Sequence, residues 1–215
     1  TGGAGFIGCH AAKYFAKKGY RIIIIDNLSR KGSVENLNWL KNQYPIKLYK
    51  TDIQDNLSLE DIFKNENNPK GILHLAAQVA VTTSVSNPRN DFNVNALGTL
   101  NILEAVRHFC PEVPFIFSST NKVYGLLNSE KISEGAKRYK IDKKKEGISE
   151  TEPLDFHSPY GCSKGSADQY VLDYARIFNL KTVSFRQSCI YGERQFGVED
   201  QGWLAWFIIA TILGK

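Results

Sequence analysis

Thr1-Gly2-Gly3-Ala4-Gly5-Phe6-Ile7-Gly8 opens the chain as a glycine-rich turn, and an apolar helical pattern follows it. Glycines with the spacing of Gly2, Gly5 and Gly8 permit a tight turn, close approach of the backbone to a pyrophosphate, and close packing of a helix on a sheet. The helix expected over about residues 6–18 would point its N–H groups and the positive end of its dipole at the phosphates. The stretch therefore predicts a dinucleotide-binding turn.

A short apolar run and an acidic residue follow this helix. Residues 20–25 are typical of a strand that is buried on both faces, and Asp26 stands at its carboxyl end. An acid about 20 residues beyond such glycines accepts hydrogen bonds from the adenosine ribose hydroxyls. Its charge would repel a 2′-phosphate, so Asp26 favours NAD over NADP. The nearby Arg30 could hold such a phosphate, which keeps NADP open as an alternative.

Beyond Asp26, short apolar strands alternate with helical patterns, which predicts a parallel sheet with helices on both faces. The expected fold class is α/β, a Rossmann-like doubly wound parallel sheet. Strands are expected at residues 20–25, 46–50, 71–77, 115–120 and 182–186, and helices at 6–18, 34–42, 56–64, 91–110 and 160–178. Because a dinucleotide-binding turn normally follows a buried strand, the sheet is expected to lack its first strand.

The same pattern indicates the domain organisation. Residues 1–190 form the expected NAD-binding Rossmann domain, with a polar, lysine-rich insertion at about residues 126–158. The insertion is expected to be solvated, with a substrate lid or a subunit contact as the alternatives. Residues 191–215 are expected to begin a smaller substrate-binding region. The chain contains no Met and stops inside the apolar run of residues 203–214, so we expect both ends to be truncated.

Composition and charge argue against several classes of function. The net charge of +5 is mild and the lysines are spread along the chain, which does not indicate nucleic-acid binding. The longest apolar run is shorter than the roughly 20 residues that a membrane-spanning helix needs. The four cysteines and four histidines lack metal-binding spacing, and no secretory segment precedes them. We therefore expect a cytoplasmic protein with free, buried thiols and no metal site.

Three side chains predict a site for proton transfer. Tyr160 and Lys164 are four residues apart at the start of an expected helix, so both point from the same face. A phenol with its ordinary pKa of about 10 is a poor base, and an adjacent ammonium favours the phenolate. The same lysine can hold ribose hydroxyls of the cofactor. Thr120, at the end of an expected strand, is suited to hydrogen-bonding the substrate oxygen whose proton Tyr160 exchanges.

Together these motifs resemble those of the extended short-chain dehydrogenase/reductase family, whose members act on nucleotide sugars. The resemblance covers essentially the whole chain. The matching motifs are residues 1–8, Asp26-Asn27-Leu28, Asp52-Ile53, His74-Leu75-Ala76-Ala77, Asn95 with Gly98-Thr99, Ser118-Ser119-Thr120, Val123-Tyr124-Gly125, and Ser158-Pro159-Tyr160-Gly161 with Lys164.

The resemblance implies NAD as the cofactor and a catalytic trio of Thr120, Tyr160 and Lys164. The NAD contacts that it implies are Gly2, Gly5, Phe6, Ile7, Asp26, Asn27, Asp52, Ile53, Leu75, Ala76, Gln78, Asn95, Tyr160 and Lys164. It also implies homo-oligomers that form through helices such as those expected at residues 91–110 and 160–178.

Within the family, the residues after Thr120 help to distinguish three reactions. The 4,6-dehydratases place an Asp-Glu pair there, whereas this chain has Asn121 and Lys122, which lack carboxyl groups. The Cys/His pair of GDP-sugar epimerase/reductases is not evident. A simple epimerase needs only removal and return of a hydride, for which Thr120, Tyr160, Lys164 and NAD suffice. The resemblance therefore favours a nucleotide-sugar epimerase.

Longer stretches narrow the resemblance to an epimerase of CDP-linked sugars. These stretches are residues 26–32, 118–125, 154–165, 173–178 and 200–203. The resemblance implies transient oxidation at sugar C2, rotation of the keto sugar in the pocket, and return of the hydride to the other face. The expected partner is thus a nucleotide sugar, with a CDP-sugar favoured. The alternatives are a UDP-hexose 4-epimerase and a non-catalytic NAD-binding protein on the same fold.

Overall fold

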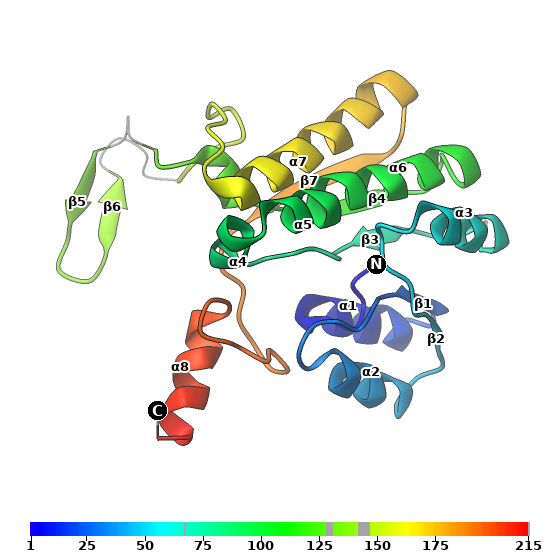
Figure 1. Cartoon of the computed structure of the whole chain (residues 1–215), viewed down its shortest axis with the longest axis horizontal. Helices are drawn as coiled ribbons and strands as arrows, with labels where there is room; N and C mark the ends of the chain where they lie inside the picture. Colours follow the sequence, from blue (N-terminus) through cyan, green and yellow to red (C-terminus); the bar gives the residue numbers. More distant parts are fainter. Residues whose placement is uncertain (67, 128–130, 142–146, 215) are drawn as a thin grey trace.

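The computed structural model describes residues 1–66, 68–127, 131–141 and 147–214 as an α/β fold, in which helices cover parallel strands (Figure 1). The strands lie close to the expected positions and confirm the Rossmann-like class. They are β1 (Ile22–Ile25), β2 (Ile46–Tyr49), β3 (Ile72–His74), β4 (Phe115–Thr120) and β7 (Thr182–Gln187).

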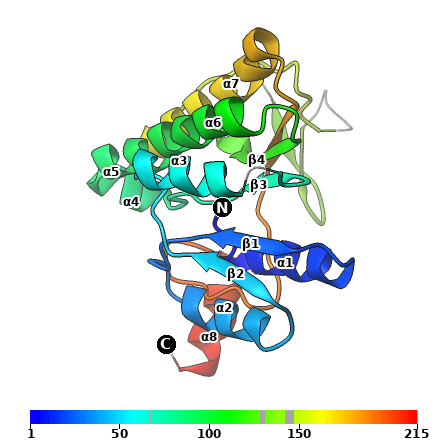
Figure 2. The same ribbon diagram turned by 90° about the vertical axis from the view of Figure 1, so that its right-hand side faces the viewer.

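These strands divide into two parallel groups, β1-β2 and β3-β4-β7, with the start of the chain between them (Figure 2). The N–H of Gly2 donates to the carbonyl of Ile25 (2.9 Å), and the N–H of Leu75 donates to the carbonyl of Thr1 (3.1 Å). A cavity of about 500 Å³ between β1 and β3 is lined by apolar residues of both strands.

Helices pack on each group of strands and form two hydrophobic clusters. Residues of α1 (Phe6–Lys17) and α2 (Ser33–Lys41) pack beside β1 around the fully buried Leu40. The larger cluster joins β3 and β4 to three further helices and includes the fully buried Phe115 and Phe117. These helices are α3 (Asn56–Asn65), α6 (Gly98–Phe109) and α7 (Ser158–Phe178). This larger cluster thereby holds α7, which carries Tyr160 and Lys164, against the β3-β4-β7 group of strands.

The long helix expected at residues 91–110 is present as a continuous helical run made of α5 (Pro88–Phe92), a π-helical turn (Asn93–Leu97) and α6. The π-helical turn inside it and the preceding α4 (Val81–Ser86) were not expected. Asn87 ends α4 and caps α5 by accepting the N–H of Asn90. Such wide turns are frequent at functional sites because they redirect side chains out of the regular helical repeat.

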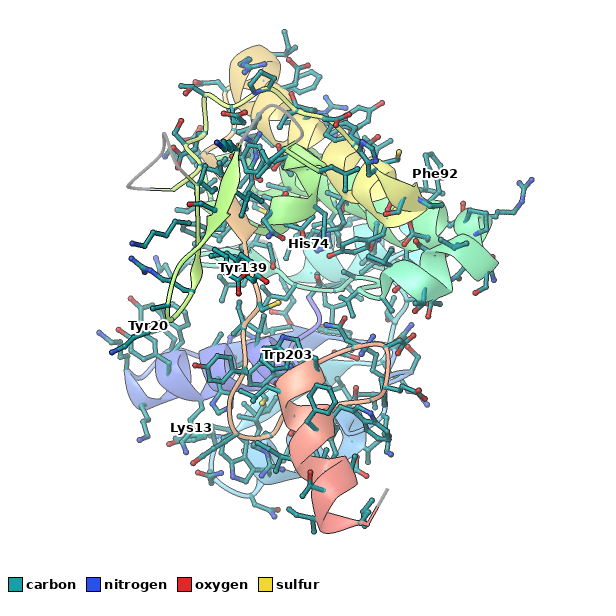
Figure 3. All side chains as sticks on the ribbon, turned by 90° about the vertical axis from the view of Figure 1, so that its left-hand side faces the viewer. Lys13, Tyr20, His74, Phe92, Tyr139 and Trp203 are labelled. Atoms are coloured by element: carbon teal, nitrogen blue, oxygen red, sulfur yellow. The ribbon has the colours of Figure 1, made fainter. Side chains whose placement is uncertain are left out.

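The remaining elements lie at the periphery. In the insertion, β5 (Ile132–Glu134) and β6 (Tyr139–Ile141) form an antiparallel hairpin, and residues 128–130 and 142–146 lie outside the described residues. A 3-10 helix, Asn121–Tyr124, follows β4. The apolar run near the chain end is α8 (Trp203–Ile212), whose Trp203 lies on the surface (Figure 3).

The sequence argues against a membrane-spanning helix and against a metal site. No helix among the described residues is long and apolar enough to cross a membrane, and their side chains form no cluster of His, Cys, Asp or Glu suited to a metal. All four cysteines are free, as expected. Cys9 and Cys110 are buried, but Cys162 and Cys189 are exposed, so the expectation of uniformly buried thiols is wrong.

Candidate active site

The glycine-rich turn is so tightly packed that side chains would not fit at two of its positions. Gly2 has a φ of +68°, and a Cβ there would lie 2.5 Å from the backbone nitrogen of Ala76. A Cβ at Gly8 would lie 2.2 Å from the carbonyl oxygen of Gly2. Gly5 is the N-cap of α1, and no described side chain makes a capping hydrogen bond there. The turn thus presents backbone N–H groups at the start of a helix, as an anion site requires.

Asp26 lies at the carboxyl end of β1, next to this turn. Its Oδ2 accepts the N–H of Ala4 (3.0 Å), and its Oδ1 accepts the N–H of Leu28 (2.8 Å). Asn27 beside it donates to Oδ2 of Asp52 (2.7 Å). Asp26 and Asp52, which are both expected to contact NAD, therefore also stabilise the loops on which they lie.

A cavity of about 580 Å³ lies at the carboxyl ends of the strands, where open α/β sheets bind ligands. Among the described residues, its lining includes every predicted NAD contact except Asn95. Those in the lining are Gly2, Gly5, Phe6, Ile7, Asp26, Asn27, Asp52, Ile53, Leu75, Ala76, Gln78, Tyr160 and Lys164. Asn95 is 1% exposed and lies behind Gln78, where it accepts the Gln78 N–H (2.9 Å) and donates to the Gln78 carbonyl (3.0 Å). It supports the cavity wall through Gln78, and its own contact with NAD stays a prediction.

The structure brings together the three residues predicted to be catalytic. Tyr160 of α7 lies near Thr120 at the end of β4, close enough for the Thr120 hydroxyl to lower the pKa of the phenol. Lys164 lies one turn further along α7 and is only 3% exposed. Its Nζ donates to the carbonyl of Ser118 (2.6 Å) and lies 4.0 Å from the centroid of the Phe117 ring. Because burial disfavours the ammonium, the pKa of Lys164 falls to about 7, although Asp168 and Asp91 oppose this shift.

The pKa of Tyr160 differs from the sequence-based expectation. Burial raises it above the ordinary value of 10, the hydrogen bond from Thr120 opposes that change, and the charge of Asp91 raises it further. The expected lowering of this pKa is therefore wrong for this arrangement, because desolvation of the phenolate outweighs the effect of Thr120. A protonated phenol beside a buried amine is better suited to giving a proton than to holding a permanent negative charge.

Sequence reasoning missed a buried ion pair beside the site. Asp168 is fully buried one turn beyond Lys164, and both of its oxygens accept from Arg186 of β7 (3.2 and 2.8 Å). Arg186 also donates to the hydroxyl of Tyr124 (3.0 Å). The pair ties α7 to β7 and to the 3-10 helix after Thr120. Its one sequence signal was the spacing of Asp168 from Lys164, which puts both on one face of the helix.

Comparison with known proteins gives consistent matches. The family described as GDP-mannose 4,6 dehydratase matches residues 1–200. The CDP-paratose 2-epimerase of Salmonella typhi is 50% identical over 207 residues, which cover 96% of this chain and 61% of that protein.

Solved structures agree with these matches. The UDP-glucose 4-epimerase of Thermotoga maritima, solved with UDP-glucose, has a TM-score of 0.81 and 35% identity, covering 100% of this chain and 62% of that one. The UDP-glucose 4-epimerase of Thermus thermophilus, solved with NAD, has a TM-score of 0.79 and 33% identity, covering 99% and 61%. The chain thus spans about three fifths of the length of these relatives. With its motifs, fold and family match in agreement, the chain belongs to the GDP-mannose 4,6 dehydratase family, within the extended short-chain dehydrogenase/reductases.

Proposed function

We propose that the protein is an NAD-dependent nucleotide-sugar epimerase with the activity of a CDP-paratose 2-epimerase, also called CDP-tyvelose 2-epimerase. The observation that carries this proposal is that Tyr160 and Lys164 line the same cavity as the glycine turn, with Thr120 close to the Tyr160 hydroxyl. The 50% identity to the Salmonella typhi enzyme supports the choice of a CDP-sugar and of C2.

The residues that line the cavity suit NAD. The turn at Gly2 and Gly5 would hold the pyrophosphate, and Asp26 would accept hydrogen bonds from the adenosine ribose. Lys164 would donate to the nicotinamide ribose. When bound, NAD supplies an acceptor for the hydride of the substrate carbinol and later its donor.

The side chains of this chain would then move the proton. Thr120 holds the C2 oxygen of the sugar, and Tyr160 takes the hydroxyl proton as the hydride leaves. Tyr160 accepts this proton as the phenolate, which the ammonium of Lys164 stabilises against burial, and it thereby becomes the phenol. After the keto sugar has turned over in the cavity, Tyr160 returns the proton to the same oxygen.

This reaction needs no proton transfer at carbon, which separates it from dehydration. Directly after Thr120 lie the exposed Asn121 and Lys122, neither of which can act as a carboxyl acid or base. A hydride that leaves and returns requires only the hydroxyl–phenol pair and the cofactor. The site residues thus favour epimerisation over 4,6-dehydration.

The test uses the complete protein with CDP-paratose and, separately, UDP-glucose, in D₂O. We expect conversion of the CDP-sugar to its C2 epimer, with the original hydrogen kept at C2, as observed by proton NMR. Deuterium at C2 would contradict hydride return. Turnover of UDP-glucose alone would replace this proposal by the 4-epimerase alternative, and bound NAD without turnover of either sugar would favour a non-catalytic role.

Two further features belong to this proposal. We propose that residues 191–215 begin the substrate-binding region, since Arg194, Gln195 and Phe196 already border the cavity. We also propose homo-oligomers that form through α6 and α7, because α7 leaves Ile177 66% exposed and Tyr170 46% exposed. Light scattering of the complete protein, with Ile177→Glu as the disrupting variant, tests the second point.

A further inference from the structure

A buried carboxylate lies directly behind the predicted catalytic helix. Asp91 of α5 is completely buried, while its neighbour Phe92 lies exposed on the outside (Figure 3). Oδ1 of Asp91 accepts from Nε2 of Gln78 (2.9 Å) and Nδ2 of Asn95 (3.2 Å). Its Oδ2 accepts from Oγ of Ser163 (2.5 Å). Burial raises the pKa of Asp91, and the hydrogen bonds from Ser163 and Gln78 oppose that rise because donors favour the ionised carboxylate.

The hydrogen-bond partners of Asp91 include one in the turn on the cofactor side of the cavity and one in α7, which carries Tyr160 and Lys164. Gln78 lines the cavity on the cofactor side. Ser163 precedes Lys164 in α7, and its Oγ also lies 3.2 Å from the carbonyl oxygen of Tyr160. Asp91 is therefore the hydrogen-bonded link between the turn at Gln78 and the part of α7 that carries both reactive groups.

We propose that Asp91 is a positioning residue, which joins the cofactor-side turn at Gln78 to Tyr160 and Lys164 and whose charge sets the pH range in which that pair works. This inference rests on the proposed function of the same site. Asp91 acts through its hydrogen-bond partners and its field, while Tyr160 and Lys164 carry the chemistry.

The field of Asp91 acts on both groups in the same direction. Burial lowers the pKa of Lys164 to about 7, and Asp91, together with Asp168, opposes that change. Burial raises the pKa of Tyr160, and Asp91 adds to that rise. A negative charge favours the protonated form of both an amine and a phenol, which explains the shared sign.

The other charged groups near α7 are arranged differently. Asp168 is neutralised by Arg186, and the titratable His74 of β3 is held neutral by burial. Glu104 and Arg107 of α6 pair with each other near Tyr174, several turns from Lys164. The remaining titratable groups on elements that pack against α7 are Arg89 of α5, His108 of α6, and Lys122 and Tyr124 of the 3-10 helix. Asp91 is thus a buried acid near Lys164 whose hydrogen bonds come from neutral donors.

Asp91→Asn tests the charge because it keeps the size and the acceptor toward Gln78 and Asn95. We expect both limbs of the pH profile of kcat to move to lower pH, since Tyr160 would then deprotonate and Lys164 would lose its proton at lower pH. At pH 7 the rate should fall up to about 10-fold, because a smaller fraction of Lys164 would carry its proton. NAD affinity should change little, whereas Asp91→Ala, which removes the acceptor for Gln78, should weaken it.

Ser84→Ala is the matched control. Ser84 is also completely buried, and its Oγ accepts the backbone N–H of Tyr160 (3.1 Å), but it carries no charge. We expect this variant to lower the rate without moving either limb. Equal shifts in Ser84→Ala and Asp91→Asn, or no shift in Asp91→Asn, would overturn the proposal. Asp91→Ser, a second variant without the charge, must reproduce the shift if Asp91→Asn does not fold.

A readout without turnover separates this inference from the proposed function. In the NAD-bound complete protein, the ε-carbon NMR signal of Lys164, assigned by its loss in Lys164→Met, reports the titration of the amine. Its midpoint should fall in Asp91→Asn whether or not any sugar is converted. An unchanged midpoint of the Lys164 titration in Asp91→Asn would contradict the inference about Asp91. Absence of sugar turnover in the wild type would contradict only the proposed function.

Discussion

Nζ of Lys164 lies 2.6 Å from the carbonyl oxygen of Ser118, so a lysine that is only 3% exposed ties α7 to the carboxyl end of β4. A single hydrogen bond leaves the other two N–H donors of an ammonium to the cavity that Lys164 lines. The site therefore holds a cation that burial disfavours, at the point where the proposed reaction needs positive charge.

Lys164→Met should make the fold more stable and abolish turnover. Met fills the space over Phe117 without a buried charge, and we expect the free energy of unfolding to rise by about 1–3 kcal/mol. The lowered pKa of Lys164, about 7 against 10.5, means that the penalty is complete below pH 7 and declines as pH rises toward 10.5. Urea unfolding of the NAD-free protein at several pH values measures this. A variant that is less stable than the wild type at pH 6 would contradict the argument.

Tyr160→Phe should remove the proton carrier while leaving the cofactor bound. We expect kcat to fall by at least about 10²-fold, because Tyr160 exchanges the substrate proton directly. The bound NAD, quantified after denaturation, should match the wild type, since phenylalanine keeps the cavity wall. Tyr170→Phe is the control, because Tyr170 lies on the same helix but is 46% exposed. Unchanged turnover in Tyr160→Phe would refute the role of the phenol.

The parts of the structure predicted from sequence depend on short spacings. The turn at Gly2, Gly5 and Gly8, the strand before Asp26, and the pairing of Tyr160 with Lys164 each follow from residues within a few turns of one another. The structure places them as those spacings predict. Local geometry thus sufficed for the strands, the glycine turn, Asp26 and the Tyr160–Lys164 pair, whereas the family resemblance implied the rest of the cavity lining.

The parts that sequence reasoning missed depend on contacts between distant segments. Asp91 meets Ser163 across 72 positions, and nothing in the helical pattern of residues 91–110 signals the π-helical turn that buries Asn95. The direction of the Tyr160 pKa shift also depends on how deeply the phenol is buried. Spacing alone predicts that Lys164 is near, but the desolvation that raises the Tyr160 pKa is a property of the packed fold.

Gly8→Ala should weaken NAD binding and destabilise the start of α1. The added Cβ would lie 2.2 Å from the Gly2 carbonyl oxygen, so the turn or the helix must shift, at about 1–3 kcal/mol as for an overpacked core. Gly71→Ala is the matched control, since the nearest atom to its Cβ would be 3.9 Å away. Calorimetric titration with NAD and thermal unfolding check both effects. Equal NAD affinity in the two variants would show that the close approach is unimportant.

His74 should make the fold less stable as the pH falls below about 6.5. Thr99 Oγ1 donates to the Asn95 carbonyl (2.6 Å), so it accepts from Nε2–H of His74 (3.0 Å), which leaves Nδ1 to accept from the Thr1 hydroxyl (2.6 Å). This neutral ring is completely buried, and burial holds its pKa well below 6.5.

The unfolded chain therefore binds a proton below pH 6.5 that the folded protein does not. The contribution of His74 to stability is complete above that pH and is lost by up to about 1.4 kcal/mol per pH unit below it. His74→Gln, which keeps a donor and an acceptor but cannot titrate near neutral pH, should lack this slope between pH 5 and 6.5. Urea unfolding of both proteins across that window measures the difference, and parallel curves would mean that His74 is already protonated in the fold.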